Sequence, residues 1–225
     1  MAVTATLING AINVVSGRQA LAAAGAYYSV TNATIGTGVA YATVSAFSAT
    51  ANGLIVVQNK NPAGGKSIYF DRLQMIQTAT APVATAIRGE VFNETGVVVG
   101  TTAVVTAVPV QINTAGGQAT GAVVQTFNAG AITIPAAVGT RVCQGQFMIA
   151  CGVQVAKDVT IVDFGADGVA TPHGGQTAAR ATDTATLTGI CNPIIVAPGT
   201  TSWINLWGFA TNAPTWEYNF TYVEL

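Results

Sequence analysis

Residues 54–94 constrain the fold most, because they contain strand after strand and no convincing helix. Leu54 to Val57 is an unbroken run of β-branched and aliphatic residues, as expected for a strand buried on both faces. Residues 59–65 (NKNPAGG) then concentrate turn-forming residues. An imperfectly alternating run starts at Ser67, and a third run covers residues 85–94 (TAIRGEVFNE). This order predicts β-strands joined by tight turns.

Further short strand candidates follow to the end of the chain, separated by Gly, Pro and Asn turns. The last two, residues 202–210 (SWINLWGFA) and 216–224 (WEYNFTYVE), are rich in aromatic side chains. Roughly eight to ten strands at this spacing predict an all-β fold. We expect an antiparallel β-sandwich, jelly-roll-like, that covers residues 53–225.

Residues 1–52 differ from the rest, since they are rich in Ala, Thr, Gly and Ser and Arg18 is their one charged side chain. Residues 19–26 (QALAAAGA) predict a short helical turn. Because the segment has few large side chains, we expect an extended N-terminal arm that gains its order by packing on something else. Its candidate contacts with other subunits are Tyr27, Tyr28, Tyr41 and Phe47. Deleting residues 1–50 should then leave a folded domain that no longer assembles.

The charge content of the chain bears on its partners. Charged residues make up 8% of the sequence and the net charge is −1, against about 25% charged residues in typical soluble domains. Nothing here resembles the basic footprint of a nucleic-acid or membrane-surface protein. A nearly neutral surface favours coverage by neighbouring copies, so we expect a homo-oligomer, for which a trimer is one choice. The alternative is a monomer with an exterior of Thr, Ser and Asn.

Membrane and secretion signals are not evident in the sequence. The longest apolar runs are far shorter than the roughly 20 residues of a membrane helix. The N-terminus lacks the charged start and apolar core of a secretory signal. We therefore expect no membrane partner.

The sequence offers no strong catalytic motif. Residues 65–67 (GKS) resemble a phosphate loop, but the required earlier glycine is replaced by Lys60 and a strand follows instead of a helix. His173 is the single histidine, which excludes a pair of histidine ligands. The three cysteines lack C-x-x-C spacing, so buried free thiols are expected at Cys143, Cys151 and Cys191. We predict no catalytic or cofactor-binding residue, no metal site and no enzymatic activity.

Two further patterns leave alternatives open. Asp158, Asp163 and Asp167 surround a glycine-rich loop, but their spacing misses the calcium-loop pattern, and the sequence does not decide whether they hold a cation. One strand face carries four aromatic residues, Trp216, Tyr218, Phe220 and Tyr222. Such a stripe could bind sugar rings, although a core or an interface is commoner. A carbohydrate-binding module is therefore one alternative, and a hydrolase built from distant carboxylates is a weaker one.

Two blocks of the chain resemble virion proteins of tailed bacteriophages. The first runs from Gly53 to Glu94 and includes residues 61–66 (NPAGGK), and the second is residues 192–199 (NPIIVAPG) with the aromatic strand that follows. The resemblance implies a jelly-roll structural protein, such as a decoration or cement protein on the capsid surface, assembled in the host cytoplasm. Its partner would be the major capsid protein of the same particle. A major capsid subunit and a tail or fibre component are the alternatives within this resemblance.

Overall fold

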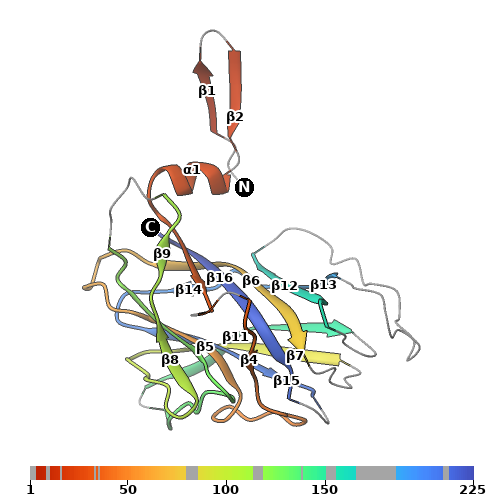
Figure 1. Cartoon of the computed structure of the whole chain (residues 1–225). Helices are drawn as coiled ribbons and strands as arrows, with labels where there is room; N and C mark the ends of the chain where they lie inside the picture. Colours follow the sequence, from red (N-terminus) through yellow and green to blue (C-terminus); the bar gives the residue numbers. More distant parts are fainter. Residues whose placement is uncertain are drawn as a thin grey trace.

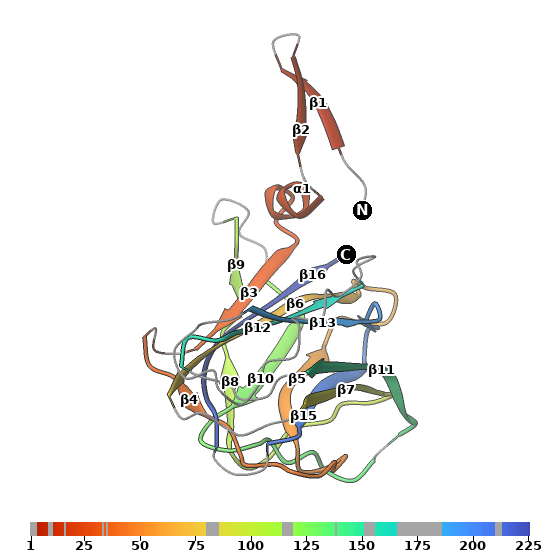
Figure 2. The same cartoon turned by 90° about the vertical axis from the view of Figure 1, so that its right-hand side faces the viewer.

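Two β-sheets packed face to face form the body of the protein (Figures 1 and 2). The computed structural model describes residues 4–8, 11–15, 17–32, 34, 36–79, 86–113, 119–137, 139–150, 156–165, 186–209 and 213–225. One sheet has six antiparallel strands, in the order β11 (Arg141–Ala150), β7 (Ala86–Glu94), β15 (Thr201–Trp207), β5 (Gly53–Asn59), β10 (Ala122–Phe127) and β8 (Val104–Ala107).

The second sheet has eight strands. Its main path is β13 (Thr186–Cys191), β12 (Val159–Phe164), β6 (Ile68–Ala79), β16 (Thr215–Glu224), β3 (Tyr27–Thr31) and β9 (Val110–Gln111). Two short strands extend it, since β14 (Ile195–Val196) pairs with β6 and β4 (Val39–Ala40) pairs with β16. Only β12 and β13 run parallel among the described pairs. The predicted all-β sandwich is confirmed, whereas the jelly-roll order of its connections stays a prediction.

The core lies between the two sheets and explains the sequence patterns. Every residue of β5 is buried, as the continuous apolar run predicts. The aromatic side chains of β16 alternate into the same core, where Trp216 and Tyr222 are 1% and 0% exposed. The aromatic stripe on this strand is therefore core and offers no exposed face to a sugar ring.

Residues 27–32 and 36–52 belong to this sandwich, unlike the expected arm. β3 lies between β16 and β9, and Tyr28 stacks on Tyr222 with ring centroids 5.3 Å apart. Tyr41 is 1% exposed, and its hydroxyl donates to the carbonyl oxygens of Asn52, at 2.6 Å, and Leu206, at 3.1 Å. The packing thus places the start of the sandwich near residue 26 rather than at residue 53.

The segment outside the sandwich consists of β1 (Thr4–Ile8), β2 (Ala11–Val15) and α1 (Gly17–Ala23). The helix ends because Gly25 takes a φ of 72°, which glycine adopts without a steric penalty. The Gly25 and Ala26 N–H groups donate to the carbonyls of Ala22 and Leu21, which closes the last turn. β1 and β2 pair as an antiparallel hairpin that stands clear of the sandwich in both views (Figures 1 and 2).

Candidate interaction surface

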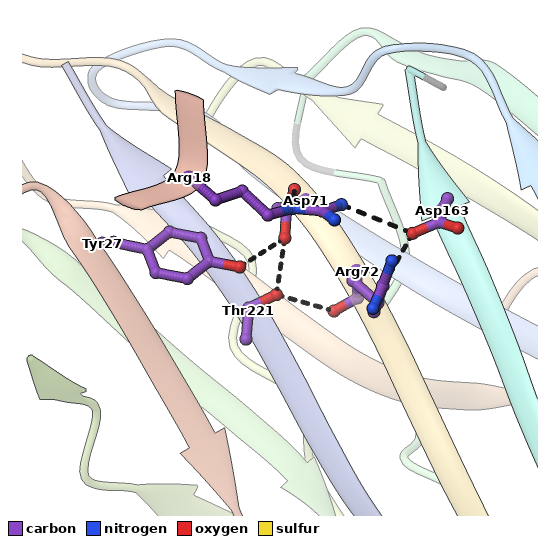
Figure 3. A network of polar contacts seen from close by, with 6 residues as sticks. All are labelled: Arg18, Tyr27, Asp71, Arg72, Asp163 and Thr221. Atoms are coloured by element: carbon purple, nitrogen blue, oxygen red, sulfur yellow. Dashed lines mark hydrogen bonds and ion pairs between the residues drawn. The ribbon is translucent and has the colours of Figure 1, made fainter. Parts of the chain in front are cut away.

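A polar network attaches α1 to the eight-stranded sheet, on the face opposite the core (Figure 3). The Arg18 Nε donates to Asp71 Oδ1 at 2.9 Å. The other oxygen of Asp71 accepts the hydroxyls of Tyr27, at 2.5 Å, and Thr221, at 3.0 Å. Burial and the hydrogen bond to Asp71 raise the pKa of Tyr27, so its phenol remains a donor at neutral pH. One carboxylate therefore joins the helix, β3, β6 and β16.

A second carboxylate extends this network to β12. Asp163 lies opposite Arg72 in the strand register and accepts its Nε at 2.7 Å. The Arg18 Nη2 lies 3.5 Å from the same oxygen, so Arg18 bridges both aspartates. Burial lowers the pKa of Arg18, but the hydrogen bond and charge of Asp71 outweigh this effect and leave it raised. Because these side chains are partly exposed, each pair alone contributes modestly to stability.

Apolar and backbone contacts complete the anchor of the helix. Leu21 and Ala22 pack on a small buried cluster formed by Ala26, Tyr27 and Val223. On the other side, the Asn113 side chain donates to the Ala23 carbonyl at 3.0 Å. The base of the hairpin is thus held against the sandwich by ionic, apolar and hydrogen-bonding contacts together.

Next to this anchor runs an apolar edge, residues 104–112, that is formed by the last strand of each sheet. β8 ends the six-stranded sheet and β9 ends the path of the eight-stranded sheet, and Val108 and Pro109 connect them (Figure 1). Four side chains are exposed along it, Val105 37%, Val108 83%, Val110 60% and Ile112 45%. The sequence has no Asp, Glu, Lys or Arg between Glu94 and Arg141, so this edge is uncharged.

On the opposite side of the sandwich the end strands of the two sheets, β11 and β13, pack closely against each other. A Cβ on Gly145 would lie 2.6 Å from the Sγ of Cys191, and one on Gly189 would lie 3.2 Å from the side chain of Ile149. Val142 and Met148 are exposed on β11, and Met148 lies opposite the exposed Arg88 of β7 in the strand register. The exposed apolar surface of that side is therefore not free of charge.

The four predicted contact residues have different environments. Tyr27, Tyr28 and Tyr41 are 9%, 2% and 1% exposed and pack within the chain. Phe47 is 46% exposed and stacks beside Phe92. In the single chain Phe47 is the one with a largely free surface, and contact with other subunits stays a prediction. The edge 104–112 was not among the contact residues predicted from the sequence. The long run without charged residues around it could have indicated it.

A hollow on the six-stranded sheet is lined by Arg88, Glu90 and Trp207. The Trp207 indole donates to both oxygens of Glu90 at 2.8 Å, and the Arg88 guanidinium covers the ring at 4.9 Å from its centroid. Phe47 packs against the same ring, with centroids 6.3 Å apart. Burial raises the pKa of Glu90. With the ring covered and one carboxylate in the lining, the hollow offers neither a stacking platform nor a pair of acids.

The other residues singled out from the sequence form no shared site where the structure describes them. Asp163 is paired with arginines and Asp158 is buried, while Asp167, His173 and Cys151 lie outside the described residues. Cys143 and Cys191 are free thiols, but only Cys191 is buried as expected, since Cys143 is exposed in the edge strand β11. Burial raises the pKa of Cys191 to about 11. In the described part of the chain no three His, Cys, Asp or Glu side chains gather to hold a metal ion.

Comparisons with known proteins add no family. The described residues contain no helix long and apolar enough to cross a membrane. No protein-family model matches the sequence, and no curated protein matches it.

Proposed function

We propose that this chain is a structural virion protein, a decoration or cement protein that stabilises a phage head through contacts between subunits. The observation that carries the proposal is the uncharged apolar edge 104–112. Its partners are further copies of the same chain, with a trimer as one assembly, and the major capsid protein. Its place is the capsid surface, its topology is a jelly roll, and its role is not enzymatic.

Burial of this edge is favourable and costs little. Fully burying a valine side chain is worth about 1.5–3 kcal/mol relative to leaving it in water, and no charged group on this edge has to lose its hydration. A particle repeats the same contact many times, and a subunit held at several points dissociates slowly. The protein therefore acts by its surface rather than by a reaction.

The alternative functions differ in how well the exposed apolar edge and the buried aromatic residues support them. A major capsid subunit or a tail or fibre component would also bury an apolar edge, and these are the alternatives within the same class. A carbohydrate-binding module loses its main support, because the aromatic residues of β16 lie in the core. A hydrolase has no pair of carboxylates in the hollow beside Trp207.

Two measurements test the proposal. Light scattering after size exclusion should give a multiple of the 22.7 kDa chain mass. Gold-labelled antibodies raised against the purified chain should decorate the outside of phage particles from the same source. A protein that stays at the chain mass at every concentration and leaves the particles unlabelled would contradict the proposal.

A further inference from the structure

The β1–β2 hairpin lacks a neighbouring strand in its own sandwich. Its register pairs Leu7 with Ile12 and Ala5 with Val14, and no further strand joins this two-stranded sheet among the described residues. A two-stranded hairpin by itself is marginally stable in water. Residues 4–15 contain no charged residue. A hairpin of this composition gains most of its stability from a partner that covers it.

The edge 104–112 has the complementary property, because it carries no charged side chain and no further described strand pairs with β8 on its outer side. Natural proteins block their edge strands with charged side chains, prolines, bulges or covering loops. Here the segment holds one proline, Pro109, and no charged residue. β8 has a strand on one side, β10, among the described residues. A further strand can therefore extend the six-stranded sheet at β8 by main-chain hydrogen bonds.

The anchor of α1 determines whose edge the hairpin can reach. Arg18 and Leu21 hold the helix against the sheet, and the hairpin continues outward from this point, away from β8 of the same chain (Figures 1 and 2). A second copy presents the same edge without this restriction. Because neither surface carries charge, their contact removes no charged group from water.

We propose that the β1–β2 hairpin of one copy adds to the edge 104–112 of a second copy. The proposal rests on the proposed function, since it names the contact through which copies of the chain assemble. The five-residue strands of the hairpin match the four residues of β8 in length. Each copy has one donor hairpin and one acceptor edge, so the contact is head-to-tail. Such a contact closes into a ring, of which a trimer is one size, or continues as an open chain.

Three double variants of the full chain test this contact. The donor variant is Leu7→Lys/Ile12→Lys in the hairpin, and the acceptor variant is Val108→Lys/Val110→Lys on the edge. The matched control is Val142→Lys/Met148→Lys, since these side chains are 54% and 61% exposed on β11. All three should still unfold in one cooperative thermal transition, because every substituted residue lies at a surface or outside the sandwich. The donor and acceptor variants should melt somewhat below the wild type, because they lose the stabilisation that assembly provides.

The masses of the variants and of their mixture in solution show whether the hairpin of one copy binds the edge of another. The donor and acceptor variants alone should each fall to the 22.7 kDa chain mass, whereas the control should keep the wild-type mass. An equimolar mixture of donor and acceptor variants should form a heterodimer of twice the chain mass, since each supplies the element that the other lacks. A mixture that stays monomeric, with both variants folded, would overturn the proposal.

If the edge 104–112 of one copy instead paired with the same edge of another copy, the masses of the variants would differ. The donor variant would then still self-associate, and its self-association would overturn the hairpin–edge contact while the wild type still labels phage particles. A wild-type chain that is monomeric and leaves particles unlabelled would instead overturn the proposed function. The two failures are therefore distinguishable.

Discussion

At the scale of single residues, Glu94 and Arg141 form the most buried ion pair in the described part of the chain. Glu94 is fully buried and accepts Arg141 Nε at 2.9 Å and Nη2 at 2.7 Å, and the guanidinium lies over Trp203. Glu94→Ala leaves a buried arginine without its partner, so we expect a loss of about 3–5 kcal/mol in the free energy of unfolding. Urea denaturation measures this loss. Glu217→Ala, at a partly exposed position, is the control and should change stability by about 0.5 kcal/mol or less. An equal effect of both substitutions would contradict this reading of the pair.

Glu90 gives the protein a pH dependence of defined sign. Burial raises its pKa above the ordinary value of 4.5, although the Trp207 hydrogen bond opposes this. The folded state therefore binds a proton more tightly than the unfolded state, and this contribution is complete below pH 4.5 and lost as the pH rises through the raised pKa. As the pH rises from 4.5 through the raised pKa, we expect the melting temperature of the wild type to fall relative to that of Glu90→Gln. A difference that does not change with pH would contradict the assignment.

At the scale of elements, local patterns predicted the strands of the core well. The strands β5, β6, β15 and β16 lie where apolar runs and alternation indicated them. A strand with one buried face needs an apolar residue at every second position, and a strand with two buried faces needs a continuous apolar run. β3 was assigned to the arm for a physical reason. Its five residues have polar and small neighbours, and its place is fixed by pairing with β16 almost two hundred residues later, as the 190-residue separation of Ser29 and Asn219 shows. Such a distant partner leaves no local signal.

The position of β3 changes the expected result of truncation. Deletion of residues 1–16 removes the hairpin and keeps Arg18, so the product should remain folded and unfold in one cooperative thermal transition. Deletion of residues 1–50 removes β3 and Tyr41, which is 1% exposed, and we expect an unfolded product by circular dichroism. A folded product of the longer deletion would instead support an arm that extends to residue 52.

The helix α1 depends on its anchor. A seven-residue helix is too short to be stable alone in water. Arg18→Ala removes the ion pairs to Asp71 and Asp163, so amide hydrogens of residues 20–23 should exchange several-fold faster. Lys60→Ala, at an exposed turn, is the control and should leave their exchange unchanged. Unchanged protection in Arg18→Ala would mean that the apolar contacts of Leu21 suffice.

At the scale of the whole molecule, the sequence predicted a charge-poor surface but not where it would lie. The uncharged run between Glu94 and Arg141 becomes an edge only because β8 and β9 end different sheets and are joined by two residues. That arrangement depends on the pairing of β10 with β5 and of β3 with β16, which neither composition nor periodicity shows. Composition thus predicted that the protein has a charge-poor surface, and the order of the strands in the two sheets determined where this surface lies.

An assembly through uncharged surfaces should respond to salts in a characteristic way. Screening weakens contacts between charges, and the Debye length falls from about 10 Å at 0.1 M to about 3 Å at 1 M salt. Because the edge 104–112 and residues 4–15 carry no charge, the dissociation constant should change by less than about twofold over this range of NaCl. Sodium sulfate should tighten association, since it strengthens burial of apolar surface. Sedimentation velocity at several concentrations measures both effects. A weakening of about tenfold or more in NaCl would place the contact on the opposite side of the sandwich, near the exposed Arg88, because only charged surfaces lose that much to screening.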